Sequence, residues 1–210
     1  MKNITEYKNI LWDFDGVIMD SMPIRDRGFI EVLKSFPEEQ VNELVAYHQK
    51  NGGLSRYVKF RYFYEQILKE SITDEQVNDL ALKFSEIMLS LLIDEALLIR
   101  DSVDFILSKG RNFNMHIVSG SDGKELNHIC KELNLSQYFI SIHGSPTPKT
   151  QLVKELMEKH GYNKNETVLI GDSFNDYDAA TKNGIHFIGY NNEELKSVGN
   201  HYVAYFNELG

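Results

Sequence analysis

The sequence contains little cysteine, little proline and fewer basic than acidic side chains. Its 210 residues include 22 Lys and Arg but 31 Asp and Glu, which gives a net charge of −9 at pH 7. An acidic surface repels the phosphate backbone of nucleic acids, so we expect no nucleic-acid partner. The single cysteine, Cys130, excludes an intramolecular disulfide. It lies beside Ile129 in a helical pattern, which predicts a buried thiol without a catalytic role.

Long hydrophobic runs are also missing. No stretch of about 18 consecutive apolar residues occurs, so we expect no membrane-spanning helix. The N-terminal segment lacks the apolar stretch of a signal peptide. These absences favour a cytoplasmic protein that is monomeric or weakly homo-oligomeric. The four prolines are widely spaced, and no segment has the composition of a flexible linker.

The hydrophobic pattern changes its period along the chain. A strand is predicted over 8–14 and is followed by an almost wholly helical region. We predict helices over 24–35, 38–50, Arg56–Leu68 (capped by Ser55) and from the capping box Thr73–Gln76 to about Leu92. After Asp101, strands over 114–119, 138–143, 167–171 and 186–189 alternate with helices over 122–133, 149–160, 175–183 and 192–198. This alternation is typical of a parallel α/β sheet.

The first strand finds its partners only beyond residue 110. We therefore expect residues 1–20 and 98–210 to form one α/β core with a Rossmann-like parallel sheet. Residues 21–97 would form an all-helical domain inserted after the first strand. In open parallel sheets, ligands bind at the carboxyl ends of the strands, so the residues that follow each strand are candidates for a site.

Two aspartates follow the first predicted strand. A single residue separates Asp13 from Asp15, so their side chains lie on the same face of an extended chain. Two carboxylates this close repel each other unless a cation or a shared proton relieves the repulsion. The pair therefore suggests a metal ion together with a nucleophile and an acid/base.

Polar residues also follow the later strands. Ser119 and Gly120 offer a hydroxyl and a backbone amide to an anion. Lys149 begins a predicted helix, with Pro148 at its first position and Thr147 as its cap. Asp172 and Asp176 complete a cluster of four carboxylates, which suits Mg²⁺ better than a softer metal. Acids, hydroxyl and lysine together suit phosphoryl transfer.

The motifs resemble those of the haloacid dehalogenase superfamily, in the expected order along residues 10–189. They are Asp13-Phe14-Asp15-Gly16, Ser119, Lys149 and Gly171-Asp172 followed by Asp176. Asp20-Ser21 and Ala179-Ala180 are similar to the phosphoglycolate-phosphatase-like branch. The resemblance implies the fold of that superfamily, with a helical C1 cap domain over 21–97.

The resemblance also implies roles for these residues. Asp13 would be the nucleophile and a Mg²⁺ ligand. Asp15 would protonate the leaving group and then activate water, and its backbone carbonyl would bind the metal. Ser119 and Lys149 would hold the phosphoryl group, while Asp172 and Asp176 would support the metal ion. Dehalogenases of the superfamily lack the second aspartate of the first motif, so Asp15 argues against that reaction.

Three functions stay open at this stage. The first is a Mg²⁺-dependent phosphatase that hydrolyses a small phosphorylated metabolite through an aspartyl-phosphate. The second is a phosphomutase of the β-phosphoglucomutase kind, which returns the phosphoryl group to its substrate. The third is a non-catalytic binding or regulatory protein on the same scaffold.

The region after Asn51 is the most distinctive part of the predicted cap. Gly52 and Gly53 interrupt the helices, and cationic and aromatic residues follow. We expect Gly52 and Gly53 to form a loop that contacts the leaving group of the substrate, and Arg56 or Lys59 to contact a polar or acidic substrate. The alternative is that these two cations belong to a solvated helix face.

Overall fold

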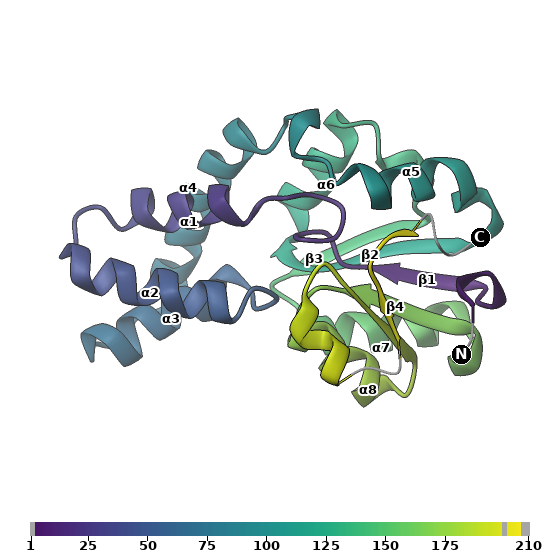
Figure 1. Ribbon diagram of the computed structural model, residues 1–210. Helices are drawn as coiled ribbons and strands as arrows, with labels where there is room; N and C mark the ends of the chain where they lie inside the picture. Colours follow the sequence, from purple (N-terminus) through teal and green to yellow (C-terminus); the bar gives the residue numbers. More distant parts are fainter. Residues whose placement is uncertain (1–2, 199–200, 207–210) are drawn as a thin grey trace.

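A computed structural model describes residues 3–198 and 201–206 of the chain. Residues 1–2, 199–200 and 207–210 of the predicted core lie outside this range. The molecule has two parts, a block of helices and a sheet with helices on both faces (Figure 1). None of the described helices has the length and apolar character needed to cross a membrane.

The sheet has six strands in the order β3-β2-β1-β4-β5-β6 among the described residues. They are β1 (Asn9–Trp12), β2 (Asn114–Asp122), β3 (Ser141–Ser145), β4 (Thr167–Gly171), β5 (His186–Tyr190) and β6 (Tyr202–Val203). All the pairings are parallel, and Asn9 lies between Asn114 of β2 and Thr167 of β4. The first strand is thus central, although its partners come much later in the sequence, and the predicted α/β class is confirmed.

Successive residues of β1 pack against different layers of helices. Ile10 and Trp12 belong to one core cluster, whereas Leu11 belongs to the other. Helices α5 (Arg100–Lys109) and α6 (Gly123–Glu132) cover the first face, and α7 (Lys149–His160) and α8 (Phe174–Asn183) cover the second (Figure 1). Burial on both faces explains why β1 reads as a continuous apolar run.

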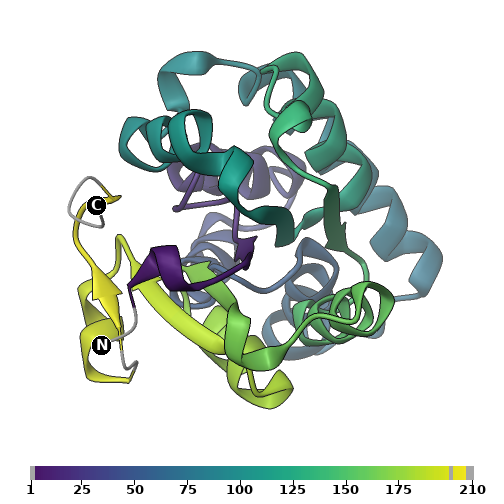
Figure 2. The same cartoon turned by 90° about the vertical axis from the view of Figure 1, so that its right-hand side faces the viewer.

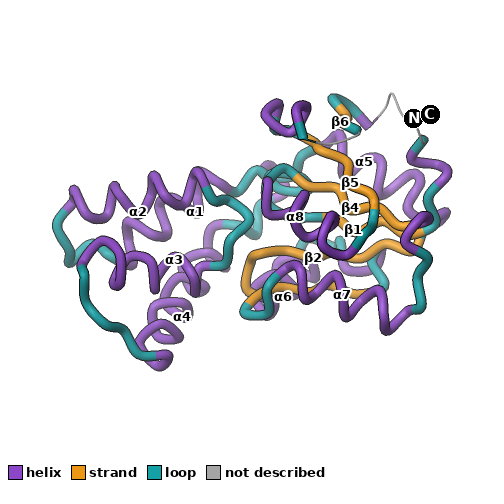
Figure 3. Tube along the Cα trace, turned by 90° about the horizontal axis from the view of Figure 1, so that it is seen from below, coloured by secondary structure: helices purple, strands orange, loops and turns teal. Residues whose placement is uncertain are grey.

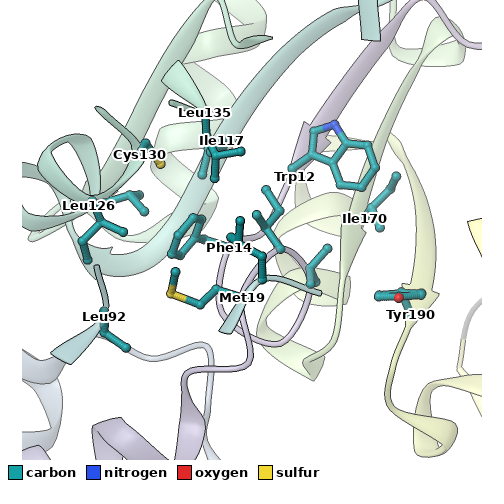
Figure 4. Packing of buried hydrophobic residues seen from close by; sticks show 14 of the residues in the cluster. Trp12, Phe14, Met19, Leu92, Ile117, Leu126, Cys130, Leu135, Ile170 and Tyr190 are labelled. Carbon is teal, nitrogen blue, oxygen red and sulfur yellow. The ribbon is translucent and has the colours of Figure 1, made fainter. Parts of the chain in front are cut away.

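The thiol of Cys130 packs in the first of these clusters (Figure 4). Its side chain is fully buried and free of any disulfide. Burial raises the pKa of the thiol to about 12. The thiol is therefore an apolar core group, as the sequence predicts.

The helical block contains α1 (Met22–Val32), α2 (Glu38–Lys50), α3 (Arg56–Tyr62) and α4 (Asp74–Leu91). It lies beyond the carboxyl ends of the strands (Figure 3) and behind the sheet in Figure 2. Phe29 packs with Phe60 and Phe84 at its centre, with ring centroids 5.4 and 4.6 Å away. The two segments that connect the sheet with the helical block lie side by side, since Met19 and Leu98 form an antiparallel bridge.

Several predicted boundaries are corrected by the structure. Helix α5 is an unpredicted element, and β2 extends beyond the expected end at residue 119 to Asp122. Strand β3 begins at Ser141 rather than residue 138, because Ser136–Tyr138 form a 3₁₀ turn before the pairing with β2 starts. The predicted last helix, over 192–198, is a 3₁₀ helix over Glu193–Ser197.

The start of α7 also differs from the prediction. Thr147 is not its cap, and Pro148 occupies the cap position with no side-chain hydrogen bond. The backbone of Pro148 is extended (ψ 142°), so the first helical residue is Lys149. The capping roles predicted for Ser55 and for Thr73 with Gln76 are confirmed.

Candidate active site

The acidic residues of the first and last motifs meet at the carboxyl edge of the sheet. Asp13 directly follows β1, and Asp172 directly follows the neighbouring strand β4. Gly16, in the loop that follows Asp13, has a φ of +75°. A Cβ on this residue would lie 1.9 Å from Asp172 Oδ2. A glycine is therefore required here by both conformation and space.

Asp13, Asp172 and Asp176 form a cluster in which one carboxylate oxygen of each lies within 4.8 Å of the others. Burial, followed by the charge of Asp176, raises the pKa of Asp13 to about 7. Burial and the charge of Asp13 likewise hold the pKa of Asp172 well above its usual value. A hard divalent cation relieves such repulsion, and an all-oxygen donor set fits Mg²⁺.

Lys149 joins two of these carboxylates. Its Nζ lies 2.9 Å from Asp13 Oδ1 and donates a second hydrogen bond to Asp176. Burial opposes the ammonium charge, but the two carboxylates outweigh it and keep the pKa of Lys149 above its usual value. Asp176 also accepts hydrogen bonds from the backbone N and Oγ of Ser173, at 3.1 and 2.5 Å. Asp176 therefore anchors the lysine that orients Asp13.

Asp15 lies in a different environment from Asp13. Its carboxylate accepts hydrogen bonds from Ser21, from Ser121 Oγ at 2.5 Å and from Arg25 Nε at 2.7 Å. Burial opposes ionisation, but the Arg25 guanidinium and the serine hydroxyls outweigh it and keep the pKa of Asp15 below its usual value. The contacts of Asp15 in this closed arrangement thus favour its ionised form.

The predicted phosphoryl-binding residues surround a small cavity next to these acids. Its walls include Asp13, Asp15, Ser119, Gly120 and Asp172, and Gly52 and Gly53 close it from the side of the helical block. Lys149 is absent from these walls, but its ammonium contacts Asp13 behind them. The structure thus brings together the residues predicted from three separate strand ends.

The loop around Gly53 sits directly on the sheet domain. Asn175 Nδ2 donates a 2.8 Å hydrogen bond to Gly53 O. A Cβ on Gly120 would lie only 2.3 Å from the same oxygen. The helical block is therefore closed over the acidic cluster, and Gly120 makes this close approach possible.

Arg56 and Lys59 are buried, with 4% and 2% of their surfaces exposed. The alternative that they form a solvated helix face is therefore wrong. Arg56 Nη1 donates to Glu125 Oε2 at 2.6 Å and to Ser85 Oγ at 2.7 Å. Lys59 Nζ lies 2.7 Å from His48 Nδ1 and donates to Gly52 O at 3.2 Å.

Arg25 and Glu125 belong to this site, although the sequence did not single them out. Arg25 Nη1 donates to Glu125 Oε1 at 3.2 Å, and the Glu125 side chain is fully buried. Neither residue lies in a motif or at a strand end. The one sequence signal for Arg25 is its position in the turn that follows Asp20-Ser21.

Burial of Lys59 should make the stability of the protein pH-dependent. Burial, followed by the charge of Arg25, lowers the pKa of Lys59 to about 7. A lysine in the unfolded chain has a pKa of about 10.4. Between pH 7 and this value, the unfolded chain therefore binds more protons than the folded protein. The free energy of unfolding should therefore rise with pH over this interval, by at most about 1.4 kcal/mol per unit from this one group.

Denaturant unfolding between about pH 7.5 and 9.5 measures this rise. We expect Lys59→Met to remove it and Lys50→Met, at an exposed lysine of α2, to retain it. Equal slopes in the two variants would contradict the assignment.

Comparison with known proteins agrees with this arrangement. The family model for haloacid dehalogenase-like hydrolases matches residues 10–190. A phosphoglycolate phosphatase of Photobacterium profundum is 26% identical over 202 residues, covering 90% of this chain and 85% of the relative. Its homologue from Aliivibrio fischeri is 22% identical, covering 90% and 88%.

Solved structures show the same fold. A predicted phosphatase from Clostridium acetobutylicum superposes with a TM-score of 0.77 at 20% identity, covering 97% of this chain and 96% of the other. A β-phosphoglucomutase from Clostridium difficile gives a TM-score of 0.74 at 18% identity, covering 97% and 93%. The family match over most of the chain and the shared architecture confirm the resemblance drawn from the motifs: the chain belongs to the haloacid dehalogenase-like hydrolases.

Proposed function

We propose that this protein is a Mg²⁺-dependent phosphatase that acts on a small phosphorylated metabolite. The observation that carries the proposal is the cavity at the carboxyl edge of the sheet. Asp13, Asp15, Ser119 and Asp172 line it together, and the Gly53 loop closes it. A nucleophile, an acid/base, a hydroxyl donor and a metal ligand thus face one small volume. The phosphatase names of the relatives agree with this chemistry.

The first step is attack on phosphorus by the Asp13 carboxylate. Its Oδ1 is fixed by the backbone N of Phe14 at 2.8 Å and by Lys149 at 2.9 Å, which orients the side chain. Ser119 and the backbone amide of Gly120 bind the phosphoryl oxygens. Asp15, which takes up a proton while the helical block and its Arg25 lie away from it, gives that proton to the leaving oxygen. The P–O bond to the leaving group breaks as the aspartyl-phosphate forms.

In the second step, water hydrolyses the aspartyl-phosphate. Asp15 takes the proton of the attacking water, phosphate leaves, and the Asp13 carboxylate is regenerated. Ser21, Ser121 and Arg25 all stabilise the ionised form of Asp15, which is the form that this step requires.

Asp13 and Asp172 would hold the Mg²⁺ ion, together with the backbone carbonyl of Asp15. Asp176 would support it through water, since both of its oxygens already bind Lys149 and Ser173. When bound, Mg²⁺ neutralises charge on the phosphoryl group and screens the nucleophile from the phosphate.

Phosphate release should depend on Mg²⁺. We expect wild-type protein to release inorganic phosphate from a panel of phosphorylated acids, sugars and nucleotides when Mg²⁺ is present. Excess EDTA should abolish release, and added Mg²⁺ should restore it and raise the melting temperature, since it relieves repulsion between Asp13 and Asp172. Full turnover in EDTA would refute the metal assignment.

The same panel separates the alternatives. Isomerised product without net phosphate release would identify a phosphomutase. Binding without either reaction would identify a non-catalytic protein. A cytoplasmic location and a monomeric or weakly associating state remain our predictions.

A further inference from the structure

Charged residues of the two domains alternate where the helical block meets the sheet domain. Arg25 Nε donates a 2.7 Å hydrogen bond to Asp15 Oδ1. Arg25 Nη1 donates to Glu125 Oε1 at 3.2 Å, and Arg56 Nη1 donates to Glu125 Oε2 at 2.6 Å. The two acids belong to the sheet domain, whereas the arginines come from α1 and α3 of the block. Movement of the block away from the sheet therefore breaks three ion pairs together.

The centre of this chain of charges is shielded from water. The Glu125 side chain is fully buried, and the side chains of Arg25 and Arg56 are at most 6% exposed. Two carboxylates and two guanidinium groups make the chain neutral. A buried ion pair adds little net stability, because desolvation offsets the attraction, but loss of one partner leaves the other charge buried and unpaired. The chain therefore favours the one position of the block in which every charge is paired.

Glu125 and Arg56 are each held by their own domain. Arg56 Nη1 also donates to Ser85 Oγ at 2.7 Å, and the guanidinium lies 4.4 Å from the centroid of the Phe84 ring. Both of these contacts come from α4 of the block. Glu125 lies in the first turn of α6, where Asp122 Oδ1 accepts a hydrogen bond from its backbone N at 3.1 Å. A fixed carboxylate thus meets a fixed cation at the interface.

Arg25 extends this contact to a reacting group. Its guanidinium is planar and rigid, so a bond that fixes Nη1 also fixes the direction of Nε. Glu125 holds Nη1, and Nε holds the carboxylate of Asp15. Glu125 therefore orients Arg25, and Arg25 orients Asp15.

The block has to leave this position in each turnover. The cavity lined by Asp13 and closed by the Gly53 loop has a volume of about 10 Å³, which is about the room of one water molecule. A phosphorylated substrate is larger, so it enters while the block is open. The ion pairs of Glu125 then break and form again around each substrate.

We propose that Glu125 is a positioning residue, which sets the closed position of the block through Arg56 and the orientation of Asp15 through Arg25. This inference rests on the proposed phosphatase function and adds a residue that acts through two arginines. Without the charge of Glu125, closure would bury Arg56 unpaired and would leave Arg25 free to turn away from Asp15. Productive closure would then be rarer, although the groups that bind the phosphoryl oxygens would be unchanged.

Glu125→Gln tests the proposal, because it removes the charge and keeps the shape of the side chain. We expect kcat/KM for phosphate release to fall about a hundredfold or more, the usual effect of removing one partner of a buried ion pair. KM should rise, since fewer substrate complexes are closed, whereas a loss of folded protein would lower kcat alone. Glu125→Asp keeps the charge and should recover part of the loss. The control is Glu132→Gln, at an exposed position of the same helix, which should keep wild-type values.

A double-mutant cycle shows whether Glu125 acts through the arginines. Arg56→Met removes the cation and keeps an aliphatic stem over Phe84. If the residues act as a unit, Glu125→Gln with Arg56→Met should have a kcat/KM within about twofold of Glu125→Gln alone. Losses that multiply, or wild-type kinetics in Glu125→Gln, would overturn the proposal.

Small-angle X-ray scattering without substrate separates this proposal from the phosphatase function. We expect Glu125→Gln to have a larger radius of gyration than wild type and Glu132→Gln, with melting curves to verify that each variant is folded. An unchanged radius in Glu125→Gln would overturn the proposal whatever its kinetics. Expansion of this variant, in a protein whose wild type releases no phosphate, would refute the phosphatase function and retain the role of Glu125 in closure. Turnover by wild type with equal scattering from both proteins would do the reverse.

Discussion

Asp13→Asn should lower phosphate release by about four orders of magnitude or more, because the variant lacks the carboxylate that attacks phosphorus. The other carboxylates have other roles: Asp176 is held by Lys149 and Ser173, Asp15 by Arg25 and two serines, and Asp172 would bind the metal ion. Steady-state phosphate release with saturating Mg²⁺ measures the loss. Asp178→Asn, at an exposed position of α8, is the matched control and should keep wild-type activity.

The same variant should not lose stability in metal-free buffer. Burial, followed by Asp176, raises the pKa of Asp13 to about 7, so the folded protein binds an extra proton between about pH 4 and 7. The wild type therefore loses stability relative to the variant as pH rises through this interval. The melting temperature of Asp13→Asn should exceed that of wild type at about pH 8 and not at about pH 4. A lower melting temperature for Asp13→Asn at both pH values would mean that the contact of Asp13 with Lys149 outweighs its repulsion by the neighbouring carboxylates.

Gly120→Ala should reduce kcat/KM by about a hundredfold while leaving the fold intact. The added methyl group would lie 2.3 Å from the backbone oxygen of Gly53, which cannot move without displacing the whole loop. The helical block would then be unable to close on Asn175, and water would reach the reacting groups. Gly120 is also close to the phosphoryl oxygens, so activity alone does not isolate closure.

Gly52→Ala provides the matched control in the same loop. A Cβ on Gly52 would come no closer than 3.9 Å to another side chain, at Met22 Cε. This variant should keep activity within about threefold of wild type. Limited proteolysis of the loop, with and without substrate, should show protection in wild type and Gly52→Ala but not in Gly120→Ala. Equal protection in all three would contradict the role assigned to Gly120.

The parallel sheet and the acidic edge could be predicted because their signals are local. The apolar run before Asp13 and the later alternation of strands and helices reflect period and burial, which each segment expresses by itself. The order of the motifs then places Asp13, Ser119 and Asp172 at the same edge, because parallel strands end there. Errors at the start of β3 and at Thr147 came from turns, where neighbouring strands and a proline backbone decide the boundary.

Burial of charge could not be predicted in the same way. A helix that carries Arg56 and Lys59 has the composition of a solvent-exposed helix. The contacts that bury these groups join residues far apart in the sequence, such as Arg25 and Arg56 with Glu125. No local pattern records such a contact.

The sequence by itself determined the fold class, the family and the candidates for the reacting groups, because these depend on periodicity and on motifs within short segments. The tertiary structure alone decided that the Gly53 loop rests on Gly120. It also decided that Glu125 of the sheet domain binds both Arg25 and Arg56 of the helical block beside Asp15. These features arise where two domains meet, and the free energy of burying a charge there is set by partners that only the folded chain brings together.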